Sequence, residues 1–250
     1  MLLVALWCAG ACAQQLSDLT TPTPIPPGSV LVIGFLGGYD RWNDEHRSVR
    51  QITLNLRERP GVYAESISNH NRQLALTLIR RTLDTNRDRK LQPKEKAAAR
   101  IILFGQSWGG AAAIDTARDL QKRGIPVLLT VQIDSVGFHD KTIPANVREA
   151  VNFYQHDQFT VRGRTEIRAA NPARTTILGN FKKSYSSRSS DASQNESSIE
   201  SPDESDLSWR RKVFGRSHAK MEQDPEVWSQ VEQYILDAIA RSSPCYEPPY

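Results

Sequence analysis

Cysteine is scarce in this sequence, which has 3 cysteines among 250 residues. Two of them, Cys8 and Cys12, fall within residues 1–13, which we interpret as a signal peptide removed on export. Removal leaves Cys245 as the last cysteine, so we predict no intramolecular disulfide in the mature chain. A lipid-modified Cys12 is the alternative, but the residues before it lack the expected aliphatic side chain.

Long apolar runs are also missing. The run at residues 2–7 is too short to span a bilayer, and it leads into Ala11-Cys12-Ala13, a small-x-small pattern typical of a cleavage site. We therefore predict a secreted or periplasmic protein without a stable membrane span.

Charge of neither sign is in large excess, since 32 Lys and Arg face 28 Asp and Glu, for a net charge of +4. No basic run is interleaved with aromatic residues, which argues against a nucleic-acid partner. With 39% hydrophobic residues, the chain suits one soluble globular domain, which we expect to be a monomer.

The expected domain spans residues 29–242. It follows a Pro/Thr-rich linker at residues 14–28 and precedes a tail at residues 243–250. Within it, residues 184–206 are rich in serine and have almost no apolar side chains, so their burial cannot offset the entropy lost on ordering. We interpret that stretch as disordered or as a mobile flap.

What the sequence does contain is an alternation of short apolar runs and amphipathic stretches. The runs predict strands at residues 30–33, 62–64, 101–104, 127–133, 150–154 and 175–178. The amphipathic stretches predict helices at residues 42–56, 73–83, 108–122 and 225–239. This order predicts an α/β fold with a mostly parallel central sheet, helices on both of its faces and no cap domain.

The most informative motif is Gly105-Gln106-Ser107-Trp108-Gly109, which lies between a predicted strand and a predicted helix. In that context, G-x-S-x-G predicts a nucleophile elbow, a strained turn that raises a serine hydroxyl above the end of the sheet. The glycines are needed because side chains at those positions would clash in so tight a turn. The alternative is a glycine-rich turn with an incidental serine.

A serine nucleophile needs a base and an acid that orients the base. His218 is the candidate base, because it follows the last predicted strand and precedes the last helix. Asp134, at the end of the strand at residues 127–133, is the favoured acid. Asp157 is the alternative and Asp140 a weaker third choice.

The developing oxyanion needs backbone donors. The N–H of Trp108, directly after the serine, is one candidate. The second is expected from Gly34-Phe35-Leu36-Gly37-Gly38, with Phe35 named first and Leu36 second. A plain glycine-rich turn is the alternative interpretation of that loop.

Taken together, residues 30–239 resemble the α/β-hydrolase superfamily, in a compact form similar to secreted lipases, esterases and thioesterase-like proteins. The resemblance rests on the loop Ile33-Gly34-Phe35-Leu36-Gly37-Gly38, the elbow at Ser107, and Ser217-His218 ahead of a Trp-bearing helix. Ile33 stands where many relatives have histidine. The resemblance implies hydrolysis of a small-molecule or lipid ester, or of a thioester, through an acyl-enzyme without an organic cofactor. The alternatives are a hydrolase-fold binding protein without turnover, and a peptidase or other acyl-transfer enzyme.

A second pattern is unrelated to the elbow. Residues 84–95 have oxygen-bearing side chains at positions 1, 3, 5 and 12 of a calcium loop, beginning with Asp84 and ending with Glu95. However, Arg89 replaces the usual glycine, and Arg87 and Lys90 oppose a cation. We therefore favour a polar connecting loop over a Ca²⁺ site, and we expect no required cofactor.

Overall fold

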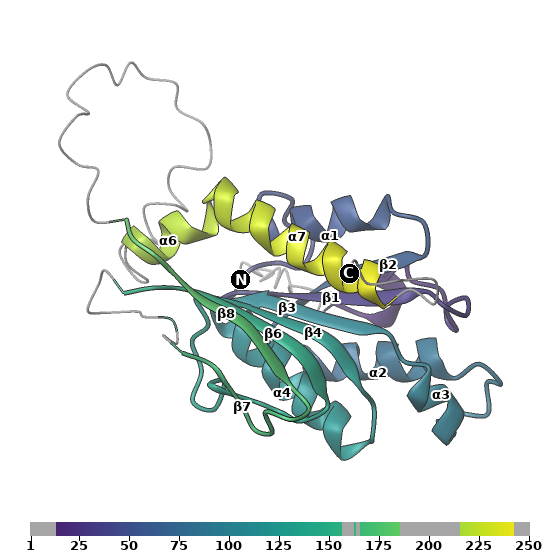
Figure 1. Ribbon diagram of the computed structural model, residues 1–250. Coiled ribbons are helices and arrows are strands. Elements are labelled where there is room, and N and C mark those ends of the chain that lie inside the picture. The colour runs from purple at the N-terminus through teal and green to yellow at the C-terminus, as the bar shows by residue number, and fades with distance from the viewer. Residues whose placement is uncertain (1–13, 157–162, 164–165, 186–215, 243–250) are drawn as a thin grey trace, which may run out of the picture.

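The computed structural model describes residues 14–156, 163, 166–185 and 216–242. Its centre is a six-stranded sheet in the order β2-β1-β3-β4-β6-β8, in which every neighbouring pair is parallel (Figure 1). The central strands are mostly apolar, and both of their faces are buried. The strands are β1 (Val30–Leu36), β2 (Val62–Ser68), β3 (Ile101–Gln106), β4 (Val127–Ile133), β6 (Val147–Gln155) and β8 (Thr176–Lys183).

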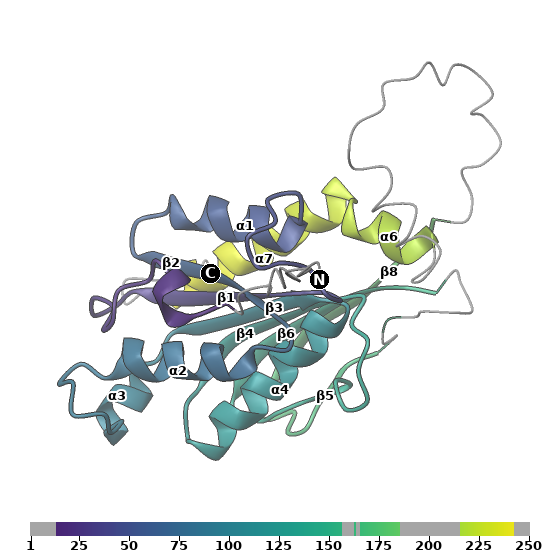
Figure 2. The same cartoon turned by 180° about the vertical axis from the view of Figure 1, so that it is seen from behind.

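Two layers of helices cover the sheet (Figures 1 and 2). One face packs against α1 (Ser48–Arg57) and α7 (Pro225–Arg241), and the other against α2 (Arg72–Leu83) and α4 (Trp108–Lys122). The predicted α/β architecture is thus confirmed, and the residues that the structure describes form no cap domain. The same part of the chain contains no helix long and apolar enough to cross a membrane.

Several short elements complete the fold. A 3₁₀ turn, η1, spans Leu16–Asp18, α3 spans Pro93–Ala97 and α6 spans Arg216–Glu222. A separate two-stranded parallel sheet pairs β5 (Thr142–Ile143) with β7 (Arg168–Ala169).

The first helix is shorter than predicted, because it begins at Ser48 and not near residue 42. Asp44 accounts for the difference. Its carboxylate accepts the N–H of His46 and binds the Arg47 side chain, so the segment forms turns in place of a helical ladder.

Strand β2 continues beyond residue 64, its predicted end, and includes the buried carboxylate of Glu65. Hydrogen bonds and an ion pair satisfy this carboxylate. Glu65 Oε1 accepts the backbone N–H groups of Thr20 and Thr21, each at 2.8 Å, and Glu65 Oε2 lies 2.5 Å from Arg57. Thr20 and Thr21 lie in residues 14–28, which we interpreted as a linker. These bonds hold that segment against β2. Ile25 of the same segment is buried, and its N–H donates to the carbonyl of Thr82.

Three sequence predictions fall outside the described residues. They are the signal peptide at residues 1–13, the tail at 243–250, and the flap at 184–206 except for its first two residues.

Candidate active site

Ser107 lies on the turn between β3 and α4, with φ of 55° and ψ of −125°. A serine rarely adopts this left-handed backbone, and such strain persists only where the surroundings enforce it. Here the Ser107 N–H donates to the carbonyl of Ile133, and the Ser107 carbonyl accepts the N–H groups of Gly110 and Val136. These bonds fix the turn to the end of β4.

The glycines around the serine are required by close backbone approach. A Cβ on Gly105 would lie 2.3 Å from the Gly109 carbonyl oxygen, and one on Gly109 would lie 2.0 Å from the Phe35 oxygen. Both distances are far inside van der Waals contact. The G-x-S-x-G motif therefore packs α4 tightly against β1 and β3, as a nucleophile elbow would require.

The structure brings His218 and Asp134 together. His218 Nδ1 lies 2.5 Å from Asp134 Oδ2, and both side chains are buried. Asp134 directly follows Ile133, the residue whose carbonyl binds Ser107, so the pair lies beside the elbow turn. His218 belongs to α6, a short helix that the sequence did not predict.

Asp134 is held by groups that the sequence did not indicate. Gly163 N–H donates to Oδ1 at 2.8 Å, and Gln155 Nε2 donates to Oδ2 at 3.1 Å. Asp134 has φ of 43°, and a Cβ on Gly163 would lie 2.1 Å from Asp134 Oδ1. The carboxylate is thus fixed before any ligand binds, which is how an orienting acid acts. No sequence motif contains Gly163 or Gln155, so the sequence gave no indication that these residues would bind Asp134.

The other acid candidates are placed differently. Asp140 is buried and accepts the Ser135 hydroxyl at 2.5 Å, below the turn that carries Asp134. Asp157 lies outside the described residues.

The loop after β1 faces the serine through Gly37. A Cβ on Gly37 would lie 3.2 Å from Ser107 Cβ, whereas Phe35 is an interior strand residue in register with Ile67 and Gly105. Asn69 Nδ2 donates to the carbonyls of Leu36 and Gly38, and so fixes the loop.

Trp108 is the first residue of α4. A helix supplies no acceptor of its own for the N–H groups of its first turn, and the positive end of its dipole lies there. The Trp108 amide therefore belongs to a helix end that favours developing negative charge.

A buried ionic cluster joins the loop after β1 to the helix that carries His218. The Arg47 guanidinium lies 2.9 Å from Asp44, 3.6 Å from Asp40 and 3.3 Å from Glu222. Asp40 follows the Gly37-Gly38 turn, and Glu222 ends α6. Sequence patterns could not reveal that Glu222 joins this cluster, because it is far from Arg47 in the sequence.

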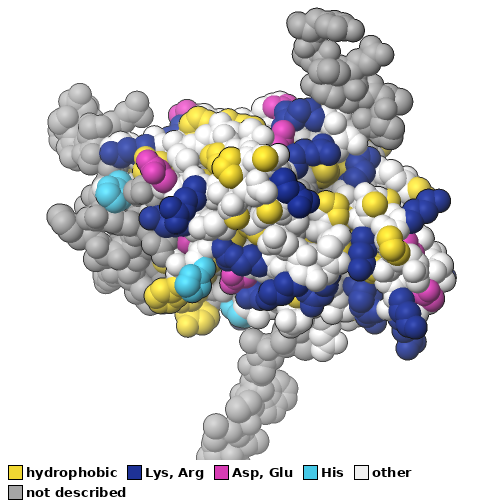
Figure 3. All heavy atoms as spheres, turned by 60° about the horizontal axis from the view of Figure 1, so that its bottom comes forward, with side chains coloured by type: hydrophobic (Ala, Val, Ile, Leu, Met, Phe, Trp, Pro, Cys, Tyr) yellow, Lys and Arg dark blue, Asp and Glu magenta, His cyan; other side chains and the backbone are white. Residues whose placement is uncertain are grey.

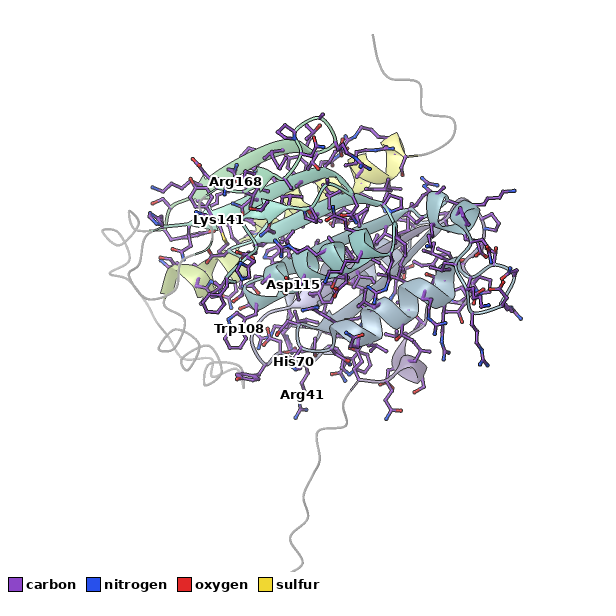
Figure 4. All side chains as sticks on the ribbon, turned by 90° about the horizontal axis from the view of Figure 1, so that it is seen from below. Arg41, His70, Trp108, Asp115, Lys141 and Arg168 are labelled. Carbon is purple, nitrogen blue, oxygen red and sulfur yellow. The ribbon has the colours of Figure 1, made fainter. Side chains whose placement is uncertain are left out.

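Exposed aromatic residues lie on the turn that carries the serine and on the loops after β1 and β4. Among the described residues, the exposed large hydrophobic side chains are Tyr39, Trp108 and Phe138, and Tyr39 packs edge-on against Trp108 with ring centroids 5.6 Å apart. All three follow the carboxyl ends of central strands. In the view of Figure 4, Trp108 lies between Arg41 and Lys141, whose side chains are exposed.

In the loop with the calcium-like pattern, Asp84 and Glu95 accept hydrogen bonds from other residues of the same loop. Asp84 Oδ2 accepts the Arg89 N–H, and the two oxygens of Glu95 accept the N–H groups of Thr85 and Gln92. The Thr85 hydroxyl, followed by these N–H groups, lowers the pKa of Glu95. Within the described part of the chain, no group of three or more His, Cys, Asp or Glu could hold a metal ion.

No protein-family model matches this chain, and no curated protein matches it in sequence.

Proposed function

We propose that this chain is a serine hydrolase that cleaves a carboxylic ester or thioester through an acyl-enzyme. The observation that carries the proposal is the strained serine turn next to a buried Asp–His pair. Ser107 adopts a backbone conformation that costs about 1 to 3 kcal/mol, and Asp134 and His218 form a short hydrogen bond beside it. An incidental glycine-rich turn would need neither feature.

In the proposed reaction, Ser107 Oγ attacks the carbonyl carbon of the substrate. Because Nδ1 of His218 is bound to Asp134, Nε2 is the nitrogen that takes the serine proton. Asp134 keeps the imidazole in this tautomer and stabilises its positive charge. The Trp108 N–H and an N–H of the Gly37-Gly38 turn hold the oxyanion; this turn takes the place of Phe35 and Leu36, which the sequence favoured and which lie within β1.

The tetrahedral intermediate then collapses. The bond from the carbonyl carbon to the leaving oxygen or sulfur breaks, and the leaving group takes the proton from His218 Nε2. A water molecule then gives a proton to the same nitrogen and attacks the acyl carbon. The bond from that carbon to Ser107 Oγ breaks, Oγ takes the proton back from Nε2, and the acid is released. Each step needs only the residues named here.

The burial of the pair formed by Asp134 and His218 favours this proposal over its main alternative, a binding protein of the same fold without turnover. A protein that only binds ligands has no need for a short hydrogen bond between a buried imidazole and a carboxylate, supported by Gln155 and Gly163. Removing the pair from water is costly, so its retention favours chemistry at this position.

Labelling and turnover with the mature protein test the proposal. We expect a fluorophosphonate probe to label the wild type and not Ser107→Ala, with hydrolysis of p-nitrophenyl acetate lost in the same variant. Ser135→Ala serves as a matched control, since it removes a nearby buried hydroxyl and leaves the elbow intact. Equal rates for wild type and Ser107→Ala would refute the proposal.

A further inference from the structure

A basic pocket lies at the edge of the sheet opposite the serine. Helix α2 leaves the carboxyl end of β2 and leads toward the start of β3, so its last residues reach the amino ends of the strands. Figure 2 shows this end of α2, beside α3, far from α6. The pocket has a volume of about 600 Å³. It is lined by Thr23, Pro24, Arg80, Arg81, Asp84, Arg87 and Arg89.

The four arginines of this pocket are exposed, and within the described residues none of them lies in an ion pair. Asp84 is the one acid in the lining, but it is buried and its Oδ2 is bound to the Arg89 backbone. Arg72 and Arg118, on the same side of the sheet, are by contrast paired with Asp115 and Asp119. The pocket therefore has a concentrated positive potential.

The loop backbone adds a second observation. Arg87 and Arg89 have φ of 61° and 66°, a region that glycine and asparagine occupy at lower cost. Hydrogen bonds from the loop hold them there, including the Arg89 N–H to Asp84 and the Lys90 N–H to Asp88. Long cationic side chains at strained positions indicate a use for those side chains. Figure 3 shows that Lys and Arg predominate over Asp and Glu on the face formed by α2 and α4.

We propose that this pocket binds a phosphate-bearing ligand with at least two negative charges. A guanidinium is planar and binds two phosphate oxygens at once, so four arginines that line one pocket favour phosphate over a single carboxylate. The volume exceeds that of one phosphate group, which favours an oligophosphate or a phosphate monoester. The ligand class follows from Arg80, Arg81, Arg87 and Arg89 and does not depend on the proposed hydrolase activity.

Calorimetric titration of the mature protein with tripolyphosphate, at constant ionic strength, tests the proposal. The key variant is Arg87→Asn/Arg89→Asn, because asparagine tolerates the left-handed backbone and the loop keeps its fold. The control is Arg41→Gln/Lys141→Gln, which removes two exposed positive charges at the opposite edge of the sheet. We expect at least about a tenfold weaker affinity in the pocket variant and less than about a twofold change in the control.

Sedimentation with phosphatidic acid vesicles, against phosphatidylcholine vesicles, shows where the phosphate comes from. Binding that depends on Arg87 and Arg89 only with vesicles identifies a lipid headgroup, and binding only with tripolyphosphate identifies a soluble phosphate. Both results support the site. Equal weakening in the pocket and control variants, or binding to neither probe, overturns it. A melting temperature at least equal to the wild type excludes unfolding as the cause of a loss.

Discussion

His218 Nδ1 lies 2.5 Å from Asp134 Oδ2, although the two residues are 84 positions apart in the sequence. The pair meets beside the strained turn of Ser107. If the carboxylate orients the imidazole, Asp134→Asn leaves the site assembled but favours the wrong tautomer, and we expect kcat to fall about a thousandfold or more. Hydrolysis of p-nitrophenyl acetate measures the effect. Asp157→Asn is the control, and a larger loss in that variant would move the acid to Asp157.

A substitution at Gly163 also tests the role of the Asp134 carboxylate, because the Gly163 N–H donates to its Oδ1. A Cβ at this position would lie 2.1 Å from Asp134 Oδ1, so Gly163→Ala must displace the acid or its neighbour. We expect kcat to fall at least about tenfold, while KM changes little. The control is Gly61→Ala, which introduces strain at φ of 74° far from the site and should lower stability by about 1 kcal/mol without changing kcat. Equal losses of activity in both variants would contradict a specific role for Gly163.

The sequence predicted the parallel sheet because its signal is local. Strand β4 and helix α4 have the bounds that the sequence predicted. A mostly apolar run and an Ala-rich amphipathic stretch can be recognised from neighbouring residues alone. The serine turn could also be recognised from the sequence, because its glycines and its serine lie within five consecutive residues. Chain order selected His218, and a place at the end of a strand favoured Asp134 over Asp157; the structure brings His218 and Asp134 into contact.

What could not be predicted depends on long-range contacts. Glu65 appeared too polar for a buried strand, yet Arg57 and the threonines of the N-terminal segment satisfy it. Gly163 and Asn69 carry no motif, and their importance follows only from the atoms that they meet in space. Hydrogen bonds between distant residues decide such positions, and hydrophobic periodicity does not report them.

Arg47 joins two parts of the candidate site. Its guanidinium contacts Asp40, on the loop after β1, and Glu222, at the end of the helix that bears His218. Arg47→Gln removes this positive charge from beside two buried carboxylates, so we expect the free energy of unfolding to fall by about 3 kcal/mol and kcat to fall as well. Urea denaturation and ester hydrolysis measure the two effects. Arg41→Gln, on an exposed neighbour, should change stability by less than about 0.5 kcal/mol. Unchanged activity in a folded Arg47→Gln protein would show that the cluster is only structural.

The exposed aromatic residues give a prediction about substrate length. Tyr39 is 77% exposed and Phe138 is 94% exposed, in the loops after β1 and β4, and Tyr39 packs against Trp108, the residue after Ser107. Each methylene group that a substrate buries against such surfaces contributes about 0.8 kcal/mol. We expect Tyr39→Ala/Phe138→Ala to lower kcat/KM at least about fivefold for p-nitrophenyl octanoate and to leave the acetate nearly unchanged. The acetate is the internal control, and equal factors for both esters would contradict contact with the acyl chain.

Glu95 gives a prediction about pH. The Thr85 hydroxyl and the N–H groups of Gln92, Thr85 and Asn86 lower its pKa below the ordinary 4.5. Because the pKa is lower in the folded state than in the unfolded chain, the carboxylate stabilises the fold above pH 4.5, and this contribution is lost as the pH falls through the folded-state pKa. Glu95→Gln should therefore lower the free energy of unfolding at pH 7, and its difference from the wild type should shrink as the pH falls below 4.5. Thr85→Val removes one donor and should give a smaller change with the same pH dependence. Urea denaturation at a series of pH values measures both, and a difference that stays constant with pH would refute the role of the ionised carboxylate.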